Sequence, residues 1–544
     1  MQNSANTTRS GRGLSYKWIV AFTVVFGIFM SILDSTVANI AIPRLQTAFG
    51  ASLDDVQWVL SGYTLALGVA TPLTGYLAER LGTKRLYVTA LTIFTACSAL
   101  CGLAWSLPTL ILFRILQAMG GAFLFPISIT LIYSEFPPHE RGMAMGVLGV
   151  PILFAPALGP TLGGYLITYA SWQLIFYINV PIGIIGIVLA VLFLRELPHE
   201  GNPRFDGWGF LLSGIGLGSI LYGFSNVSQD GWGSTTVLGF LIGGSIALCL
   251  FVIVELLIIW REGQPLLDLR FFSDPSFTPN LVANVFVTFI LYGGLLLLPL
   301  YLQVLRGLSP YEAGLFLLPQ ALCSMVVVVV GGRLVDKIGT KPVVLPGLLF
   351  MALPLWGLLN VTPSTSYSWF QFLLILRGGE IGLVSQPLMR AALVNVPPRR
   401  LSQASSLMTV VRFIAGSLVT AVLGSLVQGQ VQAHYAHLAE QVTPGTSKGQ
   451  FLLSIQARLQ ARGMDAFHAS HLAIIEVAKL VQRQAYSLAL QDGYRFTFFM
   501  LIPAILAVLF VRAPRVRRPE ETQSESRSER SEGNIEELEL MHAV

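Results

Sequence analysis

An acidic residue stands inside a long apolar stretch near the start of the chain. Asp34 falls within residues 18–42, in the segment IFMSILDSTVANIAIP. At about 1.5 Å of rise per residue, a helix of this length exceeds the ~30 Å hydrocarbon layer of a bilayer. A charged Asp inside that layer costs at least about 2.5–3.5 kcal/mol. The position therefore predicts a carboxyl group that faces the protein interior or a wet cavity and exchanges a proton. The alternative is a hydrogen-bonding anchor between helices.

Two further charged positions lie within apolar stretches. Arg114 lies six residues into the fourth stretch and cannot lose its charge. It could favour the ionised form of Asp34 or repel its proton, or it could extend to the interface or pair with Gln117. Glu380 follows Arg377 by three residues, a spacing that allows either a second proton site or a self-neutralising pair.

The remaining reactive residue types indicate no other chemistry. The histidines lie outside the apolar stretches, so carboxylates are left to carry any proton. The four cysteines all fall within apolar stretches, where packing is the expected role. Within the membrane we find no metal-ligand cluster and no nucleophile with a base. We therefore expect no enzyme, no metal and no cofactor.

The composition requires a membrane protein of many spans. Of 544 residues, 53% are hydrophobic and 12% are charged, where soluble domains have about a quarter charged. No run shows the short alternating pattern of a β-barrel strand. An all-α polytopic fold follows, with apolar stretches near residues 18–42, 55–78, 86–105, 109–132, 142–167, 172–194, 207–226, 236–260, 279–303, 311–335, 342–361, 368–392, 402–428 and 495–512.

The placement of positive charge predicts the orientation. With the N-terminus inside, Arg44 and Arg306 are the only basic residues of the short outer loops. Most of the other Lys and Arg fall on the inner side. This pattern predicts that both termini are cytoplasmic. The Glu-rich tail after the basic cluster at residues 512–518 is expected to be disordered.

The two halves of the chain repeat each other. The segment GYLAERLGTK at residues 75–84 returns as GRLVDKIGTK at residues 332–341, and the Arg114 and Gln117 positions return as Arg377 and Glu380. Duplicated six-helix units are a common plan for transporters. We expect a cytoplasmic N-terminus at residues 1–17, six-helix bundles at 18–194 and 279–512, a two-helix insert within 195–278, a long outer loop at 429–493 and a tail at 513–544.

Several of these segments resemble known motifs. LDSTVANIAIP at residues 33–43 resembles the first-helix signature of the fourteen-helix drug:proton antiporters of the major facilitator superfamily, the EmrB/QacA type. Residues 75–85 resemble the loop between the second and third helices of that superfamily, residues 114–121 its basic fourth-helix motif, and residues 172–181 its sixth-helix motif. In the fifth helix, the antiporter motif is similar at Gly146, Gly159, Pro160, Gly163 and Gly164.

The resemblance implies a major facilitator fold and a proton acceptor at Asp34 that is coupled to substrate. The implied function is proton-coupled export of drugs or other lipophilic compounds by alternating access, across the bacterial inner membrane. A proton-coupled exporter of a lipid or a specific metabolite is the alternative. The similarity at the fifth helix favours export over uptake; the alternative is tight packing without directional meaning.

Charged residues at the cytoplasmic helix ends could form a gate. Glu79, which stands where Asp is usual, could pair with Arg141, and Asp336 could hold the matching loop of the second half. Arg80 and Lys84 belong to the same loop. Such exposed pairs contribute under about 1 kcal/mol each, so a gate needs the whole network. Charge that only sets the topology is the alternative.

A substrate cavity is expected between the halves near mid-membrane. Its candidate residues are Asn39, Trp58, Tyr63 and Gln117, which are polar or aromatic. Amphipathic spacing within residues 467–490 indicates a helix that either lies on the membrane surface or receives a periplasmic adaptor protein. The expected partners are thus a lipophilic or amphipathic small molecule and membrane lipids, with a periplasmic adaptor protein under the second alternative. Nucleic acid is not expected as a partner.

Overall fold

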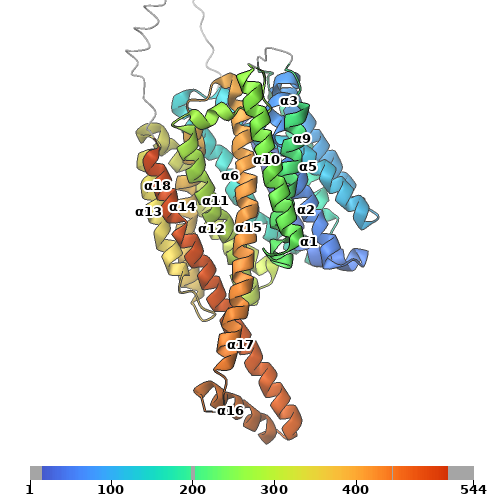
Figure 1. The fold of residues 1–544 in the computed structure, drawn as a ribbon, viewed down its shortest axis with the longest axis vertical. Helices are drawn as coiled ribbons and strands as arrows, with labels where there is room; N and C mark the ends of the chain where they lie inside the picture. Colours follow the sequence, from blue (N-terminus) through green and yellow to red (C-terminus); the bar gives the residue numbers. More distant parts are fainter. Residues whose placement is uncertain (1–14, 198–202, 262, 444, 512–544) are drawn as a thin grey trace, which may run out of the picture. The chain divides into compact units, whose positions relative to one another are not determined.

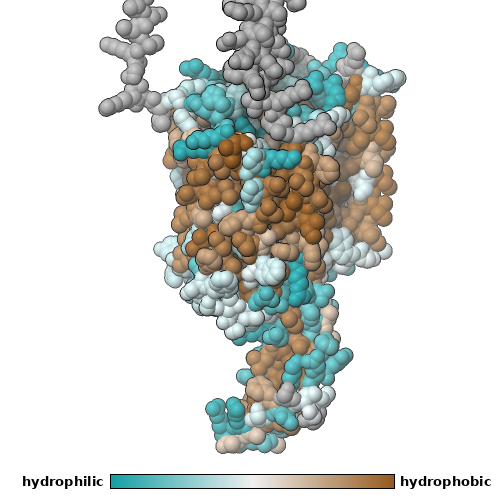
Figure 2. All heavy atoms as spheres, turned by 90° about the vertical axis from the view of Figure 1, so that its left-hand side faces the viewer, coloured by the Kyte–Doolittle hydropathy of each residue, from teal (hydrophilic) through white to brown (hydrophobic). Residues whose placement is uncertain are grey.

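The structure is a computed structural model, and it describes residues 15–197, 203–261, 263–443 and 445–511. The expected N-terminal segment up to residue 14 and the tail from residue 512 lie outside the described residues. Within them every long element is an α-helix, and 13 helical segments are long and apolar enough to cross a membrane. Figure 2 shows on one face a belt of apolar side chains between more hydrophilic ends.

The first repeat unit contains helices α1 to α8. Their bounds are α1 (Tyr16–Phe49), α2 (Leu53–Ala70), α3 (Leu73–Leu81), α4 (Thr83–Gly102), α5 (Leu107–Glu135), α6 (Arg141–Tyr169), α7 (Leu174–Tyr177) and α8 (Asn179–Phe193). The span expected at residues 55–78 is divided into α2 and α3. The division falls at Thr71 and Pro72, where proline lacks the N–H that a continuous helix would use.

The insert and the second repeat unit complete the described chain. The insert consists of α9 (Gly207–Asp230) and α10 (Thr235–Trp260). The second unit contains α11 (Phe277–Leu300), α12 (Pro310–Ile338), α13 (Lys341–Leu358), α14 (Tyr367–Ala392), α15 (Leu401–Glu440), α16 (Ser447–Ala461), α17 (Ala466–Phe499) and α18 (Leu501–Phe510).

Serine residues begin several spans at the end of the bundle predicted to face outward. The side chains of Ser52, Ser106, Ser309 and Ser366 each accept a hydrogen bond from a backbone N–H in the first turn of α2, α5, α12 and α14. Such caps satisfy N–H groups that a helix start leaves without an intrahelical partner. The sequence thus fixes where these four helices begin.

The segment expected as a long outer loop is helical over most of its length. Helix α15 continues to Glu440, α16 follows, and α17 runs from Ala466 to Phe499 before the last span is completed by α18. Figure 1 shows α15 and α17 leaving the bundle together, with α16 at the far end of this hairpin. The amphipathic stretch at residues 467–490, for which the sequence left two alternatives open, is thus part of one continuous helix, α17.

The repeat units contact each other mainly through α6 of the first unit and α15 of the second. Helix α6 packs along α12, and α15 packs against α3 and α5. Helix α9 of the insert lies against both α2 and α15, whereas α10 packs mainly on α9. One apolar cluster contains Leu86 and Ile132 of the first unit together with Leu393 and Leu401 of the second. This cluster joins the units at the end where α1 begins, the predicted cytoplasmic end.

Candidate functional site

Asp34 is the centre of a buried polar cluster in the first unit. Its side chain on α1 forms an ion pair with Arg114 of α5, with 2.5 Å between Oδ2 and Nη1. Oδ1 accepts hydrogen bonds from Gln117 Nε2 at 3.0 Å and from Asn179 Nδ2 of α8 at 2.8 Å. Asp34 is 2% exposed and Arg114 is fully buried. The cluster places a cation and two amide donors on the carboxylate, so this conformation stabilises its charged form.

Arg114 is held by contacts from three other elements. Its Nη1 also donates to Gln117 Oε1 at 2.9 Å, and its Nε donates to the backbone oxygen of Val59 at 3.4 Å. The guanidinium lies 4.0 Å from the ring centre of Tyr63 on α2 and 5.5 Å from that of Phe176 on α7. These aromatic faces favour a cation. The pairing predicted as one alternative, Arg114 with Gln117, thus exists together with the Asp34 contact.

Sequence reasoning missed Asn179 as a member of this cluster. Asn179 donates to Asp34 and also, at 3.1 Å, to Ser98 of α4, which in turn donates to the backbone oxygen of Phe176. The available signal was an amide within the apolar run at the start of the sixth span. In the sequence, residues 172–181 stand out only by their resemblance to the sixth-helix motif.

The expected substrate-cavity residues do not gather around one cavity. Tyr63 and Gln117 are buried in the Asp34 cluster. Trp58 is 41% exposed and stacks on Tyr222 of the insert helix α9, with 5.6 Å between ring centres. Asn39 is exposed on α1. The prediction of a shared lining is therefore wrong for this conformation, because two of the four side chains are used in the packing of the first unit.

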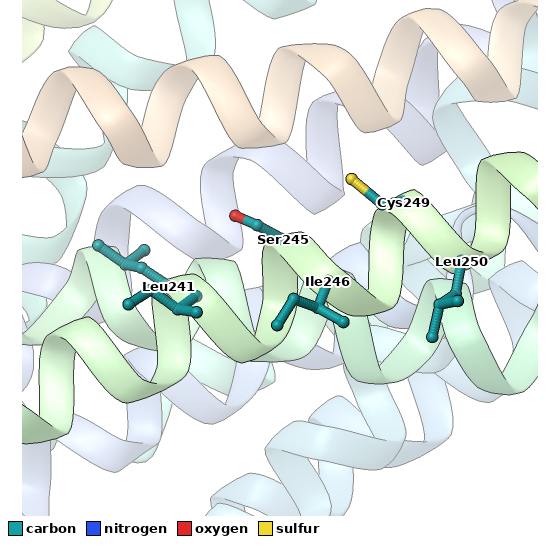
Figure 3. Close-up of a pocket in the computed structure, with 6 residues that line it drawn as sticks. Leu241, Ser245, Ile246, Cys249 and Leu250 are labelled. Atoms are coloured by element: carbon teal, nitrogen blue, oxygen red, sulfur yellow. The ribbon is translucent and has the colours of Figure 1, made fainter.

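Figure 3 shows a pocket at a different place in the molecule. It has a volume of about 390 Å³, and the residues that line it belong to α10: Leu241, Ile242, Ser245, Ile246, Cys249 and Leu250. None of the predicted site residues contributes to it. The pocket follows the outer helix of the insert and is not the mid-membrane cavity that the sequence predicts.

Arg377 and Glu380 do not form the self-neutralising pair that was one of the two alternatives for them. Both side chains are buried, and no ion pair joins them within 4.0 Å among the described residues. Arg377 instead donates from Nη2 to the backbone oxygen of Ile290 on α11 at 2.8 Å. Although the two residues are three apart on α14, the guanidinium is directed toward α11.

The glycines of the fifth span allow α6 to pack closely on both sides. A Cβ at Gly146 would lie 2.7 Å from the backbone oxygen of Val328 on α12, and one at Gly159 would lie 2.3 Å from Thr36 Oγ1 on α1. Helix α6 remains α-helical through its prolines. The motif residues that share this interface region are Pro160, Gly163 and Gly164, the last two against Val37 of α1 and Tyr311 of α12.

At the predicted cytoplasmic end, Asp336 joins the two units. Its oxygens accept hydrogen bonds from the backbone N–H groups of Gly142 and Met143 at the start of α6, both at 2.8 Å. Arg390 of α14 completes the site with 3.1 Å between its Nη2 and Asp336 Oδ1. A carboxylate at a helix N-terminus is stabilised by the helix dipole and by the free N–H groups.

Glu79 makes a related contact, but not the predicted one. Its Oε1 accepts a hydrogen bond from Gln403 Nε2 of α15 at 3.0 Å. Burial raises the pKa of Glu79, while the Gln403 hydrogen bond and the charge of Arg400 act in the opposite direction. The pair with Arg141 does not form, because Arg141 donates to the Phe136 backbone oxygen at 3.2 Å and covers the ring of Tyr133.

The two remaining gate candidates contact only the first unit. Arg80 donates to the hydroxyl of Tyr76 one turn earlier on α3. Lys84 Nζ donates to the backbone oxygen of Val191 on α8 at 2.8 Å, and its backbone N–H donates to Glu196. Of the five gate candidates, Glu79 and Asp336 thus contact the other unit, whereas these hydrogen bonds of Arg80, Lys84 and Arg141 stay within their own unit.

Comparison with known proteins identifies the family. The family model of the Major Facilitator Superfamily matches residues 24–420. The lincomycin resistance protein LmrB of Listeria innocua is 33% identical over 81% of this chain and 92% of its own. The multidrug export protein EmrB of Escherichia coli is 30% identical over 83% of this chain and 88% of its own. The chain therefore belongs to the Major Facilitator Superfamily.

A solved structure confirms the predicted fold. The human organic anion transporter MFSD10 superposes with a TM-score of 0.57 at 14% identity, covering 89% of this chain and 99% of its own. At this identity the likeness concerns the fold alone. The major facilitator fold of this multi-pass membrane protein is thus shown, with the Asp34 cluster enclosed by its first unit.

Proposed function

We propose that the protein is a proton-coupled exporter of lipophilic small molecules, of the fourteen-helix EmrB/QacA type. The observation that carries this proposal is the buried ion pair of Asp34 and Arg114 on two different spans. The printed names of LmrB and EmrB, an antibiotic resistance protein and a multidrug export protein, support the export of drugs. We place the protein in a bacterial inner membrane with both termini cytoplasmic, as a transporter and not an enzyme, driven by the proton gradient without a cofactor.

The proposed cycle depends on the charge of Asp34. A proton that enters from outside neutralises the carboxylate, and Arg114 then loses its only ion-pair partner among the described residues. Because a buried cation without a partner is strongly unfavourable, the contacts between α1 and α5 must rearrange. In this step the two units move so that the site becomes accessible from the other side of the membrane. Release of the proton on the inner side restores the ion pair. Tyr63, Gln117 and Asn179 contact the pair and hold it in position.

The hairpin of α15, α16 and α17 suits a partner outside the membrane. It projects from the bundle (Figure 1) and exposes Phe451, Phe467 and Ile474 at 46%, 68% and 53%. We propose that a periplasmic adaptor protein binds there. In this proposal the substrate and the membrane lipids contact the transmembrane bundle and not the hairpin.

Transport in proteoliposomes tests the proposal. With an imposed proton gradient, the wild type should export lipophilic cationic dyes and show matching proton flux, and Asp34→Asn should abolish coupled flux while substrate binding persists. Asp54→Asn, the same change at an exposed position of α2, serves as the matched control and should transport normally. Unchanged coupling in Asp34→Asn would disprove the role of Asp34, and competition by lysolipids but not by dyes would favour a lipid exporter.

A further inference from the structure

The second unit contains its own buried pair of charged residues. Arg377 and Glu380 of α14 occupy the positions that Arg114 and Gln117 occupy on α5 in the repeat. Arg377 is 1% exposed and Glu380 is fully buried. The acid of the first unit stands on its first helix, whereas the acid of the second unit stands on the same helix as the arginine. Each unit therefore encloses a carboxyl group, but on a helix that is not the equivalent one in the repeat.

Glu380 has no hydrogen-bond or ion-pair partner among the described residues. Neither of its side-chain oxygens has a hydrogen-bond partner, and no ion pair reaches it among the described residues. Arg377 donates from Nη2 to Ile290, while its Nε and Nη1 are without partners. Gly294 of α11 makes this orientation possible, because a Cβ there would lie 2.0 Å from Arg377 Nη2. The guanidinium thus occupies space beside α11 and leaves Glu380 unpaired.

No other charged or titratable group around α14 takes the place of Arg377 as a partner for Glu380. Beside Arg377 stands Tyr494 of α17, whose hydroxyl has no hydrogen-bond partner, and Cys323 of α12 lies near Gly379. Helix α11 carries no charged residue, and its tyrosine, Tyr292, packs toward Gly416. Charged residues of α6, α12 and α13 lie near the ends of those helices. Among the described residues, none of these groups forms a hydrogen bond or an ion pair with Glu380, and the cation that acts on it is Arg377.

A carboxylate cannot be kept in such a place at low cost. Transfer of an isolated ionised carboxylate into an apolar interior is so unfavourable that the group takes up a proton instead. Asp34 differs in this respect, since it has a bonded arginine and two amide donors. One fold therefore contains one acid whose contacts favour the charged form and one whose surroundings favour the neutral form.

We infer that Glu380 is a second proton-carrying site, which is protonated in this conformation while Asp34 is ionised. Arg377 is the residue that causes Glu380 to release its proton. When the guanidinium leaves Ile290 and turns toward Glu380, three residues along the helix, the carboxylate gains a cation. The O–H bond of Glu380 then breaks, the proton leaves to water, and the carboxylate remains paired with Arg377. The use of this proton in transport rests on the proposed function, but the protonation itself does not.

Infrared difference spectroscopy of the purified full-length protein in nanodiscs tests the protonation. The spectrum of the wild type minus that of Glu380→Gln at neutral pH should show the loss of a protonated carboxylic acid band. Loss of a carboxylate band instead would overturn the inference. Because Gln has the same size as Glu and no charge, the variant should fold. If it does not, Glu380→Asp serves, since it should shift the acid band without removing it.

One further variant and a chemical label locate the effect and separate the two proposals. Asp34→Asn should retain the acid band of Glu380, and its own difference spectrum should show the loss of a carboxylate. Labelling with dicyclohexylcarbodiimide, which modifies protonated carboxyls in apolar surroundings, should mark Glu380 and not Asp34 in peptide mass spectra. If coupling survives in Asp34→Asn, the proposed function fails while the band remains. If the band is absent and Asp34→Asn still loses coupling, only the inference fails.

Discussion

At the scale of single residues, the Asp34 and Arg114 pair should dominate the stability of the first unit. Asp34→Asn leaves a buried guanidinium without a counter-charge, which costs about 3–5 kcal/mol, and Arg114→Gln leaves the carboxylate with only Gln117 and Asn179. The double variant removes both charges and should recover most of that loss. Thermal unfolding in detergent across the four proteins of this cycle measures the coupling. Additive losses in the double variant would show that the pair does not act as a unit.

The sequence predicted the members of this pair, but not all of their contacts. Asp34 and Arg114 are conspicuous because charge inside an apolar run is expensive whatever the fold. Asn179 was missed because an amide is much cheaper there and gives a weak signal. The pairing of Glu79 with Arg141 was wrong since both residues had several possible partners near the helix ends, and only the packing of α15 against α3 brings Gln403 to Glu79.

At the scale of helices, close packing of α6 on α12 should be sensitive to one added side chain. Gly146→Val places atoms against the backbone of Val328, and overpacking of this kind costs about 1–3 kcal/mol. Gly239→Val in α10 is the matched control, because a Cβ there meets nothing within 4 Å. We expect a lower thermal midpoint and slower transport for the first variant and wild-type behaviour for the second. Equal effects of both would contradict a packing role for Gly146.

Helix number and order could be predicted because apolar length is a property of each segment alone. Thirteen of the helical segments satisfy that criterion in the described chain, and the remaining expected span is present as α2 and α3. Pro72 is a local sequence signal for that division. The direction of α17 could not be predicted, since amphipathic spacing is the same for a helix on a membrane surface and for one in a projecting hairpin.

At the scale of the whole molecule, the insert connects the two units on the predicted outer side. Trp232 of the loop after α9 donates from Nε1 to Ser425 Oγ on α15 at 2.9 Å, and Gln229 of α9 donates to Gln57 of α2. At the other end, Glu79 and Asp336 connect the same two units through α15 and α6. Motion between the units must therefore alter contacts at both ends, with α9 as a bridge at one and the two acids as a latch at the other.

The two acids of this latch should respond differently to loss of charge. Burial raises the pKa of Glu79 above its ordinary value of 4.5 when the latch is closed, so the closed form binds the proton more tightly than an open form with Glu79 in water. Closure is then favoured at low pH and weakens as the pH rises from that ordinary value through the raised one. Glu79→Gln should stay closed with a weaker pH dependence, because burial also raises the pKa of Asp336, while Asp336→Asn, which loses its ion pair with Arg390, should open at every pH. Spin-label distances between α3 and α15 measure both effects, and a wild-type pH response in Glu79→Gln would assign the titration to another group.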